Sequence, residues 1–416
     1  MQLQTILNRV EKHSSFVYES VRWVDAERAA LEVQIRARVG SRARCSGCGK
    51  RGRTYDRRAP RRFEFVPLWG LLVFFVYAMR RVDCRHCGVT VEWVPWAEGK
   101  SPMTHSYTWF LARWAKRLSW KEVAQIFGTS WDSVYRAVRV AVAWGLAHRD
   151  TSDVESIGVD EILWQRGHRY LTVVYQIDAH CRRLLWVGME RKKETLEAFF
   201  ESFGAEATAR LRYVCSDMWR PYLDVVKERA AQATHVLDRY HIVAKLNEAL
   251  DDVRAAEAKQ MKADGYEPLL KHSRWLLLKN PWRLTEPQSE KLADLLRYNL
   301  KTIRAYLLKE ELQLLWGYVS PHWAGQFLDR WCTRALRSRI EPMQKIARTL
   351  RAHRALILNW FHALGEISGA AVEGFNHKAK LTFRKAHGFR SFPPAEAALY
   401  HTLGKLPEPE FIHRFC

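Results

Sequence analysis

A series of short alternating segments between residues 155 and 240 constrains the fold more than any other feature of this sequence. Apolar and polar residues alternate in ESIGVDEILWQ, GHRYLTVVYQID and RRLLWVGMER, which predicts three successive antiparallel strands. A helical pattern follows at about 193–208, and two further short strands are predicted in RYVCSDMWRPY and THVLDRYH. This order of strands and helices is typical of an α/β sheet.

The rest of the chain divides by composition into regions around this sheet. Residues 1–100 contain paired cysteines and extended apolar runs, 104–150 have helical patterns with Trp and Arg, and 241–365 are almost continuously helical in pattern. A last helix is predicted at 369–387, with Gly388 as its C-cap. We therefore expect a multidomain α/β protein whose core, 155–240 with 366–400, is interrupted by a helical insertion at 241–365.

The charge balance indicates a polyanionic partner. The chain has 416 residues, with 67 Lys and Arg against 45 acids and a formal net charge of +22. A surface this basic attracts phosphate backbones, so DNA is the favoured partner. Basic runs in the insertion, such as RWCTRALRSRI, fit an arm that grips DNA or a second protomer, and they equally fit a solvated helical face.

Residues 65–79 form the one run that resembles a membrane segment, FVPLWGLLVFFVYAM. It is shorter than the ~20 residues of a spanning helix and rich in β-branched and aromatic residues, so we expect buried strands and no membrane partner. The first residues, MQLQTILNRVEKHSS, lack the apolar core of a secretory signal. We therefore expect a cytoplasmic protein, in which paired cysteines more often bind metal than form disulfides.

Two Cys-x-x-Cys pairs predict a structural zinc site. Cys45 with Cys48 and Cys84 with Cys87 each form a knuckle, and four thiolates supply the tetrahedral coordination of zinc in a zinc ribbon. His86 lies inside the second knuckle and is a less favoured substitute ligand. Basic residues crowd around the first knuckle, and we expect DNA contacts from Arg42, Arg44, Lys50, Arg51 and Arg53, with a solvated loop as the alternative.

The segment LSWKEVAQIFGTSWDSVYRAV, residues 118–138, has the spacing of a helix-turn-helix. Ala124 is small where two helices cross, Gly128 suits the left-handed turn, and Val134 buries the second helix. Thr129 or Ser130 would cap that second helix, which can enter a major groove. Predicted DNA contacts here are Lys121, Ser130, Ser133 and Arg136. An ordinary helical hairpin uses the same spacing.

Two carboxylates are predicted to meet at one edge of the sheet. Asp160 lies near the end of the first strand and Asp217 at the end of the fourth, so the two are neighbours if those strands pair. Because a lone Asp at a strand end often caps a turn, Glu161 and Asp178 are alternatives to Asp160, and Asp224 and Asp238 are alternatives to Asp217.

A third acid, Glu373, lies on the helix predicted at 369–387. Its apolar stripe comprises Val372, Phe375, Ala379 and Phe383, and its polar faces carry Glu373, Asn376, His377, Lys380 and Arg384. Gly374 costs about 1 kcal/mol relative to Ala within a helix, which predicts a close approach at that position. Three carboxylates can hold two Mg²⁺ ions, which together activate a water and stabilise the leaving oxygen in phosphodiester cleavage.

Several motifs resemble the ISL-three family of bacterial insertion-sequence transposases, which are similar to other DDE transposases. They are GVDE, SDMWRPY, DRYHIVAKLNEAL and VEGFNHKAKLTFRKAHGFRSF, and the resemblance covers nearly the whole chain. It implies a ribonuclease H-like core and places the catalytic acids at Asp160, Asp217 and Glu373, which would bind two Mg²⁺, with Mn²⁺ as an alternative. An aromatic-His block falls on Asp238, Tyr240 and His241.

The resemblance implies an enzyme that binds the terminal inverted repeats of a mobile element, cleaves DNA and transfers strands. It also implies a nucleoid-associated protein that assembles as a dimer or higher oligomer on DNA. His241 and Asn376 are candidates for catalytic support, although a core or capping histidine fits His241 equally. Further DNA contacts are expected from Lys378, Lys380, Arg384 and Lys385. Two rival readings are a DNA-binding regulator with an inactive core and a nuclease that cuts without joining.

Overall fold

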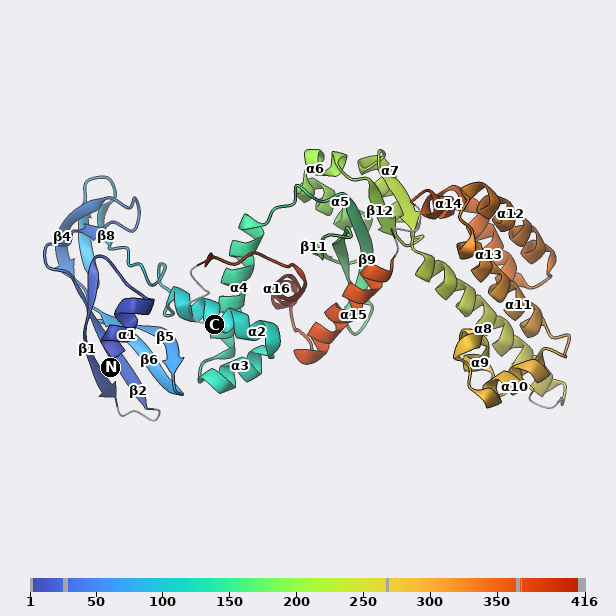
Figure 1. Ribbon diagram of the computed structural model, residues 1–416, viewed down its shortest axis with the longest axis horizontal. Helices are drawn as coiled ribbons and strands as arrows, with labels where there is room; N and C mark the ends of the chain where they lie inside the picture. Colours follow the sequence, from blue (N-terminus) through green and yellow to red (C-terminus); the bar gives the residue numbers. More distant parts are fainter. Residues whose placement is uncertain (1–2, 25–28, 267–268, 364–366, 368, 411–416) are drawn as a thin grey trace. The chain divides into compact units, whose positions relative to one another are not determined.

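The computed structural model describes residues 3–24, 29–266, 269–363, 367 and 369–410. The chain forms two compact units (Figure 1). The amino-terminal unit comprises Met1–Arg149 and Thr382–Cys416, and the central unit comprises Asp150–Leu381. Each unit contains helices and sheets, so the predicted mixed α/β class is confirmed.

The amino-terminal unit contains helix α1 (Leu3–Val10) and two sheets. One sheet has the order β1 (Phe16–Val24), β2 (Ala30–Ala37), β6 (Leu71–Tyr77), β5 (Arg61–Leu68), and the other has the order β3 (Ala43–Arg44), β4 (Arg51–Arg57), β7 (Arg80–Cys84), β8 (Gly88–Val91). Phe63, Phe75 and Trp96 are fully buried. The apolar run at 65–79 thus forms buried strands, as predicted. No helix among the described residues is long and apolar enough to span a bilayer.

Helices α2 (His105–Arg117), α3 (Trp120–Phe127) and α4 (Trp131–His148) follow in the same unit. Gly128 ends α3 with a left-handed backbone (φ 66°), which a side-chain-bearing residue adopts only at a cost. Ser130, rather than Thr129, caps α4, and its hydroxyl accepts a hydrogen bond from the Ser133 backbone N–H at 3.0 Å. Ala124 and Val134 are buried, so the predicted two-helix geometry is confirmed.

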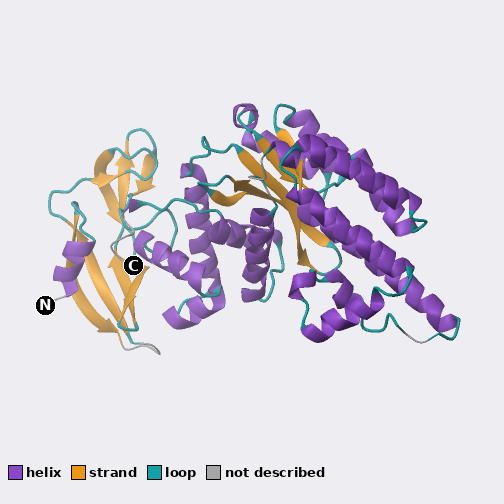
Figure 2. Ribbon diagram, turned by 45° about the vertical axis from the view of Figure 1, so that its right-hand side comes forward, coloured by secondary structure: helices purple, strands orange, loops and turns teal. Residues whose placement is uncertain are grey.

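The central unit is built on one mixed sheet. Its order is β11 (Arg182–Met189), β10 (Arg169–Ile177), β9 (Ser156–Gln165), β12 (Tyr213–Ser216), β13 (Thr234–Leu237). Strands β9 and β11 run antiparallel to β10, whereas β12 runs parallel to both β9 and β13. The five predicted strands are therefore confirmed, and Figure 2 shows helices on both sides of them.

The two faces of this sheet have different partners. On one face α5 (Lys193–Phe203) and α7 (Arg220–Arg229) enclose a core that includes Val159, Val174 and Phe199, and the short helix α6 (Ala205–Ala209) follows α5. On the other face lies α15 (Ala370–Lys385), whose Phe375 ring stacks on Tyr175 at 4.8 Å. A Cβ on Gly158, the strand partner of Tyr175, would lie 2.3 Å from Val372 Cγ2. The missing side chain at Gly158 thus admits α15 to the sheet.

The helical insertion follows β13 directly. Its elements are α8 (Arg239–Ala263), α9 (Arg274–Leu278), α10 (Glu286–Leu295), α11 (Lys301–Gln313), α12 (Pro321–Arg337), α13 (Glu341–Ala352) and α14 (Arg354–His362), with 3₁₀ turns at Pro281–Arg283 and Leu314–Gly317. Leu250, Trp331 and Met343 belong to a hydrophobic core shared by these helices. The Asn359 side chain donates to the His235 carbonyl at 2.7 Å, which ties α14 to β13. Helix α16 (Phe392–Leu403) belongs to the amino-terminal unit.

Candidate functional site

Three aspartates lie at one level across the parallel strands of the central sheet. Cys215 of β12 pairs with Gly158 of β9 and with Val236 of β13. Asp160, Asp217 and Asp238 each follow two residues after these partners, so the register aligns them in one row. The prediction that Asp160 lies near the end of its strand is wrong, because β9 continues to Gln165. Instead β12 ends early, at Ser216, and leaves that side of β9 open at Asp160.

The Asp160 carboxylate is held by neighbours on the α15 face of the sheet. Oδ1 accepts the Glu161 backbone N–H at 2.8 Å, and Oδ2 accepts the Asn376 side-chain N–H at 2.6 Å. Asn376 in turn accepts the Tyr175 hydroxyl at 3.0 Å. Asn376 is buried, so its prediction on a polar face of α15 is wrong: it is part of the packed contact between helix and sheet.

His241 lies in the first turn of α8 between two of the aspartates. Its Nε2 is 3.7 Å from Asp160 Oδ1 and 3.8 Å from Asp238 Oδ2. The pKa of His241 is raised to about 9, chiefly by its interaction with Asp160 and further by the charges of Asp238 and Asp217, while desolvation opposes the shift. His241 is therefore a cation at neutral pH, placed beside the row of acids, and not a neutral core histidine.

Asp238 occupies the third position of the row and is buried. Its Oδ1 accepts the Tyr240 backbone N–H at 2.9 Å, so it caps α8. Burial raises the pKa of Asp238, and the charges of Asp160 and Glu373 raise it further. A Cβ on Gly369 would lie within 2.1 Å of the Asp238 carboxyl atoms, so the start of α15 approaches closely here.

Asp217 is held on both oxygens by groups that the sequence did not identify. Oδ1 accepts the Trp219 backbone N–H, and Oδ2 accepts Arg191 Nη2, each at 2.9 Å. Arg191 Nε also lies 2.7 Å from Glu161 Oε1. The pKa of Glu161 is raised to about 7, first by burial and then by the charge of Asp217. Nothing in the run ERKKE distinguishes Arg191 from its basic neighbours, so only the fold could find it.

Glu373 lies in the first turn of α15 and is exposed. The charge of Glu373 raises the pKa of Asp238, so Glu373 lies within electrostatic range of the row of aspartates. The carboxylates of Asp160, Asp217 and Glu373 do not form a closed cluster of ligand atoms within 4.8 Å, a spacing that the described residues reach only in the cysteine group. No described residue of the chain makes the predicted close approach at Gly374, because none lies within 4 Å of a Cβ built there.

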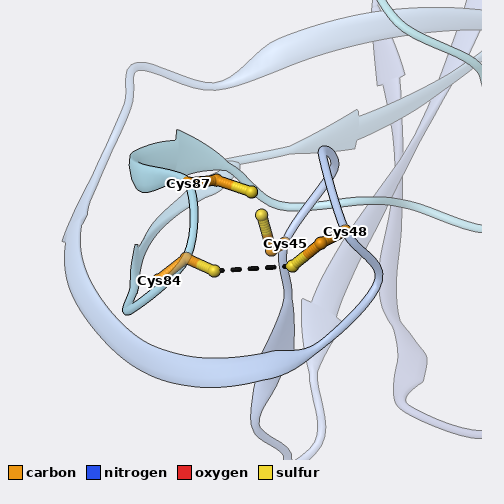
Figure 3. A group of neighbouring side chains, drawn as sticks. All are labelled: Cys45, Cys48, Cys84 and Cys87. Atoms are coloured by element: carbon orange, nitrogen blue, oxygen red, sulfur yellow. Dashed lines mark hydrogen bonds between the residues drawn. The ribbon is translucent and has the colours of Figure 1, made fainter.

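The four paired cysteines come together in the amino-terminal unit, as predicted. The sulfurs of Cys45, Cys48, Cys84 and Cys87 all lie within 4.8 Å of one another, and Figure 3 shows the four side chains pointing to one centre. The group is compatible with a tetrahedral zinc site. His86 Nε2 lies 2.9 Å from Lys50 Nζ, so His86 contacts a cation and is not a fifth candidate in the group.

The residues predicted to contact DNA are mostly exposed. Exposed members are Arg42, Arg44, Lys50, Arg51, Arg53, Lys121, Ser130, Arg136, Lys378, Lys380, Arg384 and Lys385, whereas Ser133 is half-buried. Two are already engaged within α4, since the Ser130 hydroxyl caps the helix and Arg136 pairs with Asp132. Exposure leaves the other side chains accessible to a phosphate backbone.

Comparison with known families identifies the chain. A family model named DDE_Tnp_ISL3 and described as a transposase matches residues 157–396. The matched region begins at the second residue of β9, includes the other strands of the central sheet and extends beyond α15. The chain belongs to the ISL-three family of insertion-sequence transposases.

Relatives of this transposase agree along nearly their whole length. It is 30% identical over 376 residues to the transposase for insertion sequence element IS1001 of Bordetella parapertussis, covering 89% of this chain and 91% of that one. It is 34% identical over 398 residues to the transposase for insertion sequence element IS1557 of Mycobacterium tuberculosis strain H37Rv, covering 89% and 88%. Membership in this family implies that the transposase acts on DNA by cleavage and strand transfer.

Proposed function

We propose that this transposase binds the terminal inverted repeats of its insertion sequence and catalyses Mg²⁺-dependent DNA cleavage followed by strand transfer. The observation that carries the proposal is the row of aspartates across the parallel strands, with Asp160 within β9 and Asp217 and Asp238 just beyond β12 and β13. Glu373 lies on the helix that covers the same face. Asp160, Asp217 and Glu373 are the proposed catalytic acids of a ribonuclease H-like core. The strand order and the alternation of helices and strands support that assignment.

The donor set at this site fits Mg²⁺. Its side chains offer carboxylate oxygens, which are the ligands that Mg²⁺ prefers. Burial is the main cause of the raised pKa values of Glu161 and Asp238, and the charges of neighbouring acids raise both further, so added positive charge would stabilise the group. Asp160, Asp217 and Glu373 would hold two Mg²⁺, with Mn²⁺ as an alternative. These ions supply an activated nucleophile and a stabilised leaving oxygen.

The protein's own groups orient the acids and the DNA. Asn376 holds Oδ2 of Asp160, and the Trp219 backbone N–H holds Oδ1 of Asp217, which fixes both carboxylates before substrate arrives. His241 Nε2 lies 3.7 Å from Asp160 Oδ1, and we propose that His241 supports catalysis there. Lys378, Lys380, Arg384 and Lys385 of α15 would contact the DNA backbone.

The other parts of the chain would recognise the element's ends. We assign residues 1–100 to a zinc ribbon with Zn²⁺ on Cys45, Cys48, Cys84 and Cys87, 104–150 to a helix-turn-helix, 155–240 with 366–400 to the catalytic core, and 241–365 to an insertion domain. The exposed basic residues of the first two would contact the inverted repeats. A synaptic complex of paired ends requires at least a dimer on DNA.

The test incubates the protein with labelled element ends, target DNA and Mg²⁺, alongside Glu373→Gln and the matched control Glu286→Gln. Glu286 is also an exposed first-turn acid, on α10. Joined product from wild type and the control, but not from Glu373→Gln, supports the proposal. Equal product from all three would remove Glu373 from the mechanism. Nicked product without joining would instead identify a nuclease, and end binding without cleavage would identify a regulator.

A further inference from the structure

Arg191 contacts two carboxylates at the edge of the site, those of Asp217 and Glu161, and it is not one of the proposed metal ligands. It follows β11 after a sharp bend at Glu190, whose backbone is left-handed (φ 71°). This conformation costs a non-glycine residue about 1 kcal/mol or more. Two hydrogen bonds hold the bend: Glu190 N–H donates to the Tyr170 carbonyl at 2.9 Å, and the Thr172 hydroxyl donates to the Glu190 carbonyl at 2.7 Å.

The guanidinium of Arg191 is fixed by three groups. Nη2 donates to Asp217 Oδ2 at 2.9 Å, Nε lies 2.7 Å from Glu161 Oε1, and the guanidinium carbon lies 4.5 Å from the centre of the Trp219 ring. Trp219 in turn packs edge-on against the buried Tyr222 ring at 4.7 Å. A cation stacked on an anchored aromatic ring loses little further freedom when it binds a carboxylate.

The pair with Glu161 differs from an ordinary surface ion pair. The Glu161 side chain is 9% exposed, so its carboxyl group has little access to water. Although Arg191 Nε and Glu161 Oε1 are close, they are not aligned as a hydrogen bond, and both atoms are buried without one. The well-formed hydrogen bond goes to Asp217. The guanidinium is therefore oriented for Asp217, with the buried Glu161 carboxyl group as its second neighbour.

We propose that Arg191 is a positioning residue that holds the Asp217 carboxylate in one orientation for a divalent ion. This inference rests on the proposed function. Asp217 lies one residue beyond β12, where no strand ladder restrains it. Arg191 on Oδ2 and the Trp219 N–H on Oδ1 supply that restraint, and each oxygen keeps a lone pair for a metal. Hydrogen-bond partners of metal ligands typically contribute about 10- to 100-fold to metal affinity.

The test measures Mn²⁺ binding to the DNA-free protein by calorimetry and electron paramagnetic resonance, with the Mg²⁺ concentration for half-maximal strand transfer as a second readout. We expect Arg191→Ala to bind Mn²⁺ about tenfold or more weakly. Arg191→Lys keeps the charge but cannot join two carboxylates, so we expect it to bind weakly as well. Trp219→Leu, which removes the stacking surface and keeps the backbone donor, is expected to show an intermediate loss.

The matched control is Arg212→Ala. Arg212 also pairs with a carboxylate, Glu155, at 3.0 Å and lies over an aromatic ring, Tyr213, at 5.6 Å, but both partners are remote from the row of acids in the sheet register. Its Mn²⁺ affinity should equal that of wild type. Thermal unfolding of each metal-free protein separates a change in metal binding from a change in folding. If Arg191→Ala does not fold, the Mn²⁺ affinities of Arg191→Lys and Trp219→Leu test the inference.

Two results would overturn the inference. Unchanged Mn²⁺ affinity in Arg191→Ala would show that Asp217 needs no restraint from the guanidinium. Tighter binding would show that Arg191 competes with the ion through its charge. If wild type itself binds no Mn²⁺, the proposed function fails and this inference fails with it, whereas normal wild-type binding with no effect of Arg191 leaves the proposed function standing.

Discussion

The cysteine group and the row of acids are two candidate metal sites built in opposite ways. The four cysteines come from two local pairs, and their sulfurs lie within 4.8 Å of one another. The acids come from β9, from the ends of β12 and β13, and from a helix more than 130 residues further along the chain, and they leave an open edge. A structural metal needs a closed shell, whereas a catalytic metal needs a free position for substrate. The closed site of the four cysteines therefore depends on residues close together in the sequence, whereas the open site of the acids depends on the whole fold.

Asp160→Asn should have the largest effect and tests the open site. Removing one metal-binding charge should reduce strand transfer by about a thousandfold, equivalent to about 4 kcal/mol of transition-state stabilisation. Binding to the element ends should persist, because the substitution changes no predicted DNA contact. The rate is measured with labelled ends at saturating Mg²⁺. Asp224→Asn, on the half-exposed Asp224 that pairs with Arg220, is the control and should leave the rate unchanged.

Cys84→Ser tests the closed site. Loss of one of four thiolates should release the bound zinc and cost several kcal/mol of stability in the amino-terminal unit. Zinc content by mass spectrometry should fall, and affinity for the element ends should fall with it. Cys181 lies outside the group, so Cys181→Ser should retain zinc. Full zinc content in Cys84→Ser would show that the group is not a metal site.

Gly158→Ala should have an intermediate effect, because the new methyl would meet Val372 at 2.3 Å and displace α15 from the sheet. Overpacking of this kind costs about 1–3 kcal/mol, and we expect a lower Tm together with slower strand transfer. Gly374→Ala on the same helix is the contrasting variant. Open space surrounds that position, so the variant should gain up to about 1 kcal/mol from improved helix propensity. Equal Tm values for the two variants would contradict the packing described for α15.

His235→Gln should have the smallest effect. Burial beside β12 lowers the pKa of His235 to about 4, below its ordinary value near 6.5. The unfolded chain therefore binds a proton at this histidine more readily than the folded protein does. The stability that the neutral His235 contributes is complete above pH 6.5 and is lost as the pH falls toward 4. Wild type should lose about 1 kcal/mol between pH 7 and pH 5.5 through this group, and the variant should not. Denaturant titrations at the two pH values measure the free energy of unfolding of each protein. An equal loss of stability in wild type and variant would show that another group takes up the proton.

Local patterns predicted much of the architecture. The five central strands, the α3–α4 turn at Gly128 and the grouping of the cysteines were each predicted from residues close together in the chain, and the structure contains all three. Asp160, Asp217 and Glu373 were chosen by motif, and their joint role remains a prediction. The prediction of the apolar stripe of α15 is confirmed, whereas the prediction of Asn376 on its polar side is wrong, because periodicity does not reveal which polar residue of the helix will bind a carboxylate of the sheet.

The sequence by itself therefore determined the elements and the closed cysteine site, because helical and strand periods and Cys-x-x-Cys knuckles act over a few residues. Only the tertiary structure decided that Asn376 would hold Asp160, that Arg191 would join Asp217 to Glu161, and that Gly158 rather than Gly374 would admit a close neighbour. Those outcomes depend on which distant segments meet and in what register. Side-chain contacts between such segments are settled by packing and burial, for which no local pattern carries a signal.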